Sequence, residues 1–171
     1  MYKSNIFLHT IICVLVLFLG LIISYCLSDN NYTIQPYDIS GIIHFDVSVL
    51  LKIFLKNIFV GFSIAACGFI TGGLASMLIL FWNGMLVGII LKTYNIQNEI
   101  LPYFIYHGIF EITAFVCLGI VGLNGIDFYV NLFKYNFLKI PVKFFEKLFI
   151  FALISLSIAA IIETLLISTL K

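Results

Sequence analysis

The sequence predicts an all-α, polytopic membrane protein: a compact bundle of five transmembrane helices with an interfacial connector before the last. Hydrophobic residues make up 63% of the 171 positions and charged residues only 10%, whereas a soluble domain carries about 25% charged residues. Apolar runs near the roughly 20 residues that cross a bilayer core recur along the chain. We therefore expect a single integral membrane domain over residues 1–171.

The expected spans cover about residues 5–27, 52–71, 74–92, 102–123 and 146–170. The second and third spans meet at Gly72 and Gly73 with no polar linker, which predicts a very tight helical hairpin. Pro102 suits the first turn of the fourth span. Residues 124–145 mix aromatic residues with lysines, which is typical of an interfacial connector at head-group level.

The distribution of lysines favours a cytoplasmic N-terminus and an external C-terminus. All nine basic residues are lysines, and positive charge concentrates in the cytoplasmic loops of membrane proteins. The predicted connector and the N-terminal tail hold Lys3, Lys134, Lys139, Lys143 and Lys147. The other four lysines then lie at the outer ends of spans, where long side chains reach the interface.

Composition also excludes several classes of partner. The net charge of +1 comes with no block of lysines, so we expect no nucleic acid partner. The four cysteines lie in apolar runs and form no C-x-x-C pair, so neither a disulfide framework nor a zinc site is indicated. We expect the apolar spans to contact membrane lipid.

Lone polar residues interrupt the apolar runs of the second to fifth spans. An ionisable side chain in hydrocarbon costs about 2.5 kcal/mol or more, so such residues are expected to face one another or water. At a rise of about 1.5 Å per residue, each lies roughly 8–13 Å deep on the same side, because successive spans reverse direction. They form one predicted intramembrane polar layer: Asn57, Asn83, His107, Glu111 and Glu163.

Several interpretations of this layer stay open. An interhelical hydrogen-bond clasp would hold the helices in register, whereas a proton relay or docking pocket would use the ionisable residues functionally. His107 and Glu111 share a helix face because they are four residues apart, and Lys56 could supply a cation to Glu111 or Glu163. A histidine with two carboxylates also suits a metal, but the pattern is weak, and we predict no metal, no cofactor and no catalytic residue.

Glycines in these spans predict close helix packing, because small residues let membrane helices approach one another. The glycines expected to serve this purpose are Gly72, Gly73, Gly84, Gly88 and Gly108.

Four of these elements occur in a fixed order: N-I-F-V-G from Asn57, F-W-N-G-M-L-V-G ending at Gly88, H-G-I-F-E from His107, and A-A-I-I-E ending at Glu163. Together with the glycine pair at Gly72, they resemble the stage II sporulation protein M family over most of the chain. The family pattern has a proline before the histidine, where this chain has Tyr106.

The resemblance implies an integral membrane protein of about five helices without assigned catalytic chemistry. Members in spore formers resemble scaffolds that tether cell-wall hydrolases. Others look like accessory components beside ABC transporters, including those in gene clusters for circular bacteriocins. The short segment between the first two spans favours the second branch. The 171 residues contain no G-x-x-x-x-G-K-[ST] motif, so an ATPase would be a separate chain.

We therefore expect a multi-pass, non-enzymatic accessory component of the cell membrane in an export, maturation or self-protection system. Its cargo would be a small peptide such as a bacteriocin, beside an ABC transporter. The alternatives are a membrane scaffold for cell-wall-remodelling proteins in sporulation and a proton-coupled transporter. Expected partners are other membrane proteins, including an ABC ATPase and permease or a cell-wall hydrolase, and a second copy of the chain.

Overall fold

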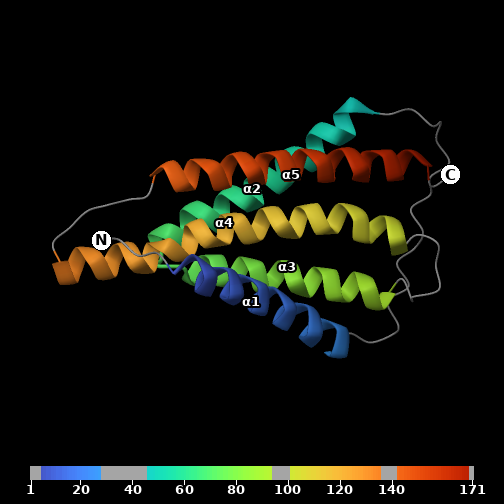
Figure 1. Cartoon of the computed structure of the whole chain (residues 1–171). Coiled ribbons are helices and arrows are strands. Elements are labelled where there is room, and N and C mark those ends of the chain that lie inside the picture. Colours follow the sequence, from blue (N-terminus) through green and yellow to red (C-terminus); the bar gives the residue numbers. More distant parts are fainter. Residues whose placement is uncertain (1–4, 28–45, 94–100, 136–141, 170–171) are drawn as a thin grey trace.

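The computed structural model describes residues 5–27, 46–93, 101–135 and 142–169. Five helices fill these ranges: α1 (Ile6–Leu27), α2 (Val47–Ile70), α3 (Leu74–Thr93), α4 (Leu101–Tyr135) and α5 (Val142–Thr169). Each is long and apolar enough to cross a membrane, so the predicted all-α class with five spans is confirmed. Successive helices run in opposite directions along the bundle (Figure 1).

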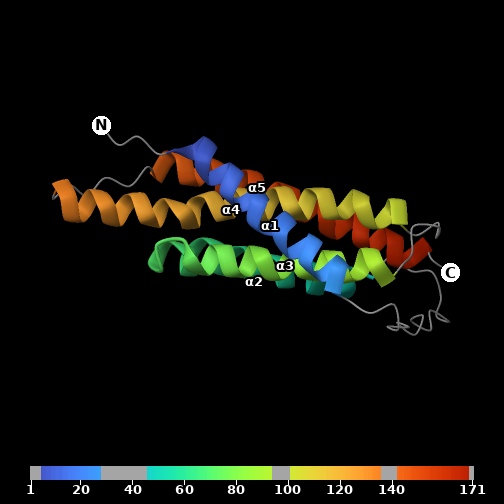
Figure 2. The ribbon, with the colours of Figure 1, turned by 90° about the horizontal axis from the view of Figure 1, so that it is seen from below.

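Helix α4 lies at the centre of the bundle and contacts each of the other four helices. Its apolar segment is 56% buried, compared with 22–33% for the others. Figure 2 shows α4 and α5 in one layer and α2 and α3 in a second layer, while α1 crosses obliquely. Because the outer faces of α1, α2, α3 and α5 carry the exposed apolar side chains, lipid is their natural solvent.

Helix α2 begins at Val47 rather than near residue 52, because Asp46 caps it. The Asp46 carboxylate accepts a hydrogen bond from the Ser48 backbone N–H at 2.7 Å, which satisfies a donor that the first helical turn leaves unpaired. The hydrogen bonds from Ser48 hold the pKa of Asp46 below its ordinary value.

A tight turn of Thr71, Gly72 and Gly73 joins α2 to α3. The two glycines have φ values of 61° and 90°, a region that side chains disfavour. The Thr71 hydroxyl donates to the Cys67 carbonyl at 2.8 Å and accepts from the Ala75 N–H at 3.0 Å. One side chain therefore satisfies backbone groups at the end of one helix and at the start of the next.

The sequence predicted that the fourth span ends near Leu123, whereas α4 continues to Tyr135. The predicted connector of residues 124–145 is thus helical up to Tyr135 and again from Val142, and the residues between lie outside the described ranges. In both views the last turns of α4 extend past the α2–α3 turn (Figures 1 and 2).

Two glycines explain why α4 stays packed beyond the predicted end. A methyl group added at Gly122 would lie 2.6 Å from the Ile64 carbonyl oxygen, and one at Gly125 would lie 2.9 Å from the Phe69 carbonyl carbon. Only glycine lets the α2 backbone come this close. The contact holds the two helices together to the end of α2.

Glycines also mediate the crossing of α1 and α3. A methyl group at Gly84 would overlap the Leu17 carbonyl oxygen, and one at Gly88 would overlap the Leu21 carbonyl oxygen. Gly20 of α1 faces the α3 backbone in the same way. Backbone therefore packs directly on backbone, which maximises dispersion contacts where lipid leaves no hydrophobic driving force between helices.

The remaining predicted packing glycines differ from one another. Gly73 packs against α4, because an added methyl group would lie 2.6 Å from Leu123 Cδ2. At Gly72 an added methyl group would make only ordinary contacts, so this residue serves the turn rather than helix packing. At Gly108 it would meet no described atom within 4 Å, so no described contact supports the packing role predicted for Gly108, and this residue borders a cavity.

Candidate functional site: an amphipathic cavity at one end of the bundle

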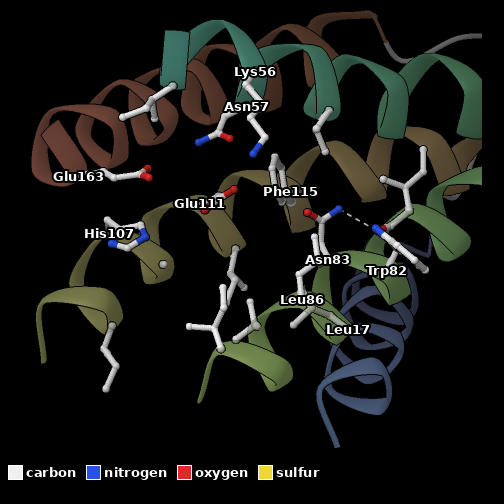
Figure 3. A pocket seen from close by; sticks show the side chains of 18 of the residues that line it. Leu17, Lys56, Asn57, Trp82, Asn83, Leu86, His107, Glu111, Phe115 and Glu163 are labelled. Carbon is white, nitrogen blue, oxygen red and sulfur yellow. Dashed lines mark hydrogen bonds between the residues drawn. The ribbon is translucent and has the colours of Figure 1, made fainter. Parts of the chain in front are cut away.

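All five residues of the predicted polar layer line one cavity of about 580 Å³ (Figure 3). Asn57 comes from α2, Asn83 from α3, His107 and Glu111 from α4, and Glu163 from α5. The starts of α2 and α4 meet the ends of α3 and α5 at the same end of the bundle (Figure 1). Alternation of helix direction therefore brings residues that are distant in sequence to one depth.

The rest of the wall is mostly apolar, with Leu17, Val60, Ile79, Trp82, Ile112 and Phe115 among its members. Neither Trp82 nor Phe115 was among the site residues predicted from the sequence. An apolar wall with a few convergent polar groups is the usual composition of a small-ligand site.

The cavity closes at the middle of the bundle. Leu17 and Phe115, each 2% exposed, belong both to the cavity wall and to the buried core. Towards the opposite end the core continues with Cys13, Ile64 and Leu80, which are all fully buried. Close-packed apolar side chains at this level separate the cavity from the opposite end of the described bundle.

Two carboxylates and one ammonium group share this space. Figure 3 shows Glu111, Glu163 and Asn57 pointing toward one another across the cavity. Lys56 and Glu163 both act electrostatically on Glu111. Among the described residues, neither glutamate forms a hydrogen bond or an ion pair. These carboxyl groups can therefore accept hydrogen bonds from water or from a polar ligand.

The two asparagines do not form the clasp that one interpretation of the sequence expected. The Asn83 side chain donates to the Ile79 carbonyl of its own helix at 2.8 Å. Asn57 is only 7% exposed, and within the described ranges its amide has no hydrogen-bond partner. Neither residue therefore links two helices through a described contact.

Hydrogen bonds between helices come instead from residues that the sequence did not single out. Ser76 of α3 donates to the Ile64 carbonyl of α2 at 2.7 Å, and Tyr129 of α4 donates to the Ile70 carbonyl of α2 at 2.8 Å. Both acceptors are carbonyls of α2, so this helix is fixed to its neighbours from two sides.

A second polar cluster, also not predicted, lies between α1 and α4 at the end opposite the cavity. His9 Nε2 lies 3.7 Å from Asp127 Oδ2, and His9 Nδ1 lies 3.5 Å from the Asn124 amide nitrogen, which also donates to Ile120 O at 2.7 Å. His9 interrupts an apolar run as His107 does, and Asn124 and Asp127 share a helix face at a spacing of three. Those two signals were available in the sequence.

No group of three or more His, Cys, Asp or Glu side chains within the described part of the chain is arranged to hold a metal ion. The cavity instead offers charge, amide groups and apolar surface, a combination suited to binding an amphipathic molecule.

Comparison with known proteins assigns the family. The profile of the family described as "Stage II sporulation protein M" matches residues 6–166. The chain belongs to the stage II sporulation protein M family. The match extends over every helix that lines the cavity, so the site is built from the part of the chain that the family shares.

A relative in this family comes from Methanocaldococcus jannaschii, where it is described as an uncharacterized protein. It is 32% identical over 166 residues, which cover 90% of this chain and 90% of the relative. No solved structure gives a significant match.

Proposed function

We propose that this stage II sporulation protein M family member is a non-enzymatic membrane subunit of an export, maturation or self-protection system. In this role it binds part of a small amphipathic peptide, such as a bacteriocin, beside an ABC ATPase and permease on separate chains. The observation that carries the proposal is the amphipathic cavity of about 580 Å³. Ligand sites span roughly 300–1,000 Å³, so the cavity suits a few side chains rather than a whole peptide.

The closed inner end of the cavity favours binding over proton-coupled transport. Proton-coupled transport relies on chains of ionisable residues along the transport pathway. Here the layer of Leu17, Ile64, Leu80 and Phe115 is buried and apolar, and it separates the cavity from the polar cluster of His9.

The proposal includes an orientation with a cytoplasmic N-terminus and an external C-terminus. Lys134 near the end of α4 and Lys143 and Lys147 at the start of α5 lie at the same end of the bundle as the start of α1 (Figure 1). Positive charge marks the cytoplasmic side, so the cavity opens toward the external leaflet, where an exported peptide emerges.

The test is copurification from native membranes after cross-linking, with two matched variants. Val60→Phe places a ring in the cavity wall, whereas Leu78→Phe places the same ring at a position where the side chain is 62% exposed. We expect ATPase and permease subunits with all three proteins. Cross-linked peptide is expected only with the wild type and Leu78→Phe.

Two results would contradict this function. Recovery of no transporter subunit with the wild type would remove the proposed system. Recovery of a cell-wall hydrolase in place of transporter subunits would favour the alternative role of a membrane scaffold for cell-wall-remodelling proteins in sporulation.

A further inference from the structure

The charges that face the cavity do not balance. Glu111 and Glu163 supply two carboxylates, and Lys56 supplies one ammonium group. One lysine thus faces two carboxyl groups across the cavity. In a site of low dielectric an uncompensated charge is costly, so the site is complementary to a ligand that brings one positive charge.

An amide at the same place lacks a partner. Asn57 is more than nine-tenths buried, points into the cavity beside Glu163 (Figure 3), and has no hydrogen-bond partner in the described residues. Its carbonyl oxygen can accept a hydrogen bond, as can both carboxylates. A primary ammonium group has three donors and no acceptor, which matches three acceptors that converge from α2, α4 and α5.

Apolar surface surrounds this polar centre. Val60, Ile79 and Phe115 border the cavity toward the middle of the bundle, where an alkyl chain would be removed from water at about 25 cal/mol per Å². The second carboxyl group, the acceptors that lack a partner among the described residues and the apolar wall together select one ligand chemistry.

We infer that the cavity binds a molecule with an apolar body and one primary ammonium group, held by Glu111, Glu163 and Asn57. A lysine side chain or the N-terminal amine of an apolar peptide segment has this chemistry, and so does an amine-bearing lipid. The peptide source rests on the proposed function, whereas the ammonium chemistry rests on the cavity alone.

Trp82 provides the assay, because it is the single tryptophan of the chain and lines the cavity. The full-length protein is placed in nanodiscs of phosphatidylcholine and phosphatidylglycerol and titrated with octylamine, octanol or octanoate. We expect a saturable change in Trp82 emission with octylamine, and only the non-saturating response of membrane partitioning with octanol and octanoate.

Matched variants separate the site from general charge effects. Glu163→Gln and Glu111→Gln each remove one carboxylate from the cavity, and we expect octylamine affinity to fall roughly tenfold or more. Glu146→Gln makes the same change at an exposed position at the start of α5 and is expected to leave affinity unchanged. Asn57→Asp adds a carboxylate and should tighten binding, a gain that a misfolded protein cannot give.

The source of the amine is resolved in the same assay. Competition by an apolar peptide with one lysine, but not by its acetylated form, identifies a peptide ligand. Loss of the octylamine response in phosphatidylethanolamine nanodiscs identifies a lipid ligand. Equal responses to octylamine and octanol, or unchanged affinity in Glu163→Gln and Asn57→Asp alike, would overturn the inference. These results leave copurification of transporter subunits as a separate test of the proposed function.

Discussion

The contact between α1 and α3 predicts that Gly84→Ala weakens the bundle. The added methyl group would overlap the Leu17 carbonyl oxygen and lie 3.0 Å from the Leu17 carbonyl carbon and 3.2 Å from Leu21 N. These are backbone atoms, which cannot rotate away, so α1 must shift as a whole. Overpacking of this kind costs about 1–3 kcal/mol.

Alanine also gains helix propensity over glycine by about 1 kcal/mol, which offsets part of this cost. Gly108→Ala is the matched control, because the same change on α4 meets no described atom within 4 Å. It gains propensity without crowding. We therefore expect Gly84→Ala to be destabilised by up to about 2 kcal/mol, Gly108→Ala to be neutral or more stable, and the two variants to differ by about 1–3 kcal/mol.

The assay is reversible unfolding of the purified protein in mixed micelles of increasing sodium dodecyl sulfate, followed by circular dichroism. The difference in free energy of unfolding between the two variants isolates the crowding, because the propensity gain is common to both. Equal stability of Gly84→Ala and Gly108→Ala would refute the backbone contact between α1 and α3.

Two further changes test other contacts. Ser76→Ala removes the hydrogen bond to the Ile64 carbonyl and is expected to cost about 0.6–2 kcal/mol in the same unfolding assay. Ser157→Ala loses only a hydrogen bond within α5 and should cost less. The reverse order would contradict a stabilising hydrogen bond between α3 and α2. The pKa of Asp46 is lowered in the folded protein, so its cap stabilises α2 fully at pH values above the pKa of Asp46 in the unfolded chain. This stabilisation is lost as the pH falls through the pKa of Asp46 in the folded protein. The amide chemical shift of Ser48 should change with pH as Asp46 titrates, and this change should be absent in Asp46→Asn. A titration that persists in that variant would point to a different group.

The depth of the cavity residues followed from the sequence because two physical rules are enough to set it. Helical rise converts the position of Asn57 or Glu163 in its span into a depth, and alternating direction puts those depths on one side. What the rules do not give is the side-chain partner. Asn83 bonds to the Ile79 carbonyl of its own helix, an option that any polar residue in a helix retains.

The extension of α4 was missed because the signals for a helix end are local. Gly122, Asn124 and Gly125 together indicate a break when read along the chain. In the bundle the glycines accept the α2 backbone, and the Asn124 amide is satisfied by the Ile120 carbonyl. Tertiary contacts thus override a local preference of about 1 kcal/mol per glycine.

The dependence of the α2–α3 turn on α4 has a consequence for how the protein is made. Tyr129 satisfies the Ile70 carbonyl and Leu123 covers Gly73, yet both α4 residues leave the ribosome after the hairpin has been synthesised. Until they arrive, the Ile70 carbonyl can bond only to water or to other groups near the turn. The α2–α3 turn therefore gains its full set of contacts only after α4 has been synthesised. A nascent chain that stalls before α4 would expose this turn without them.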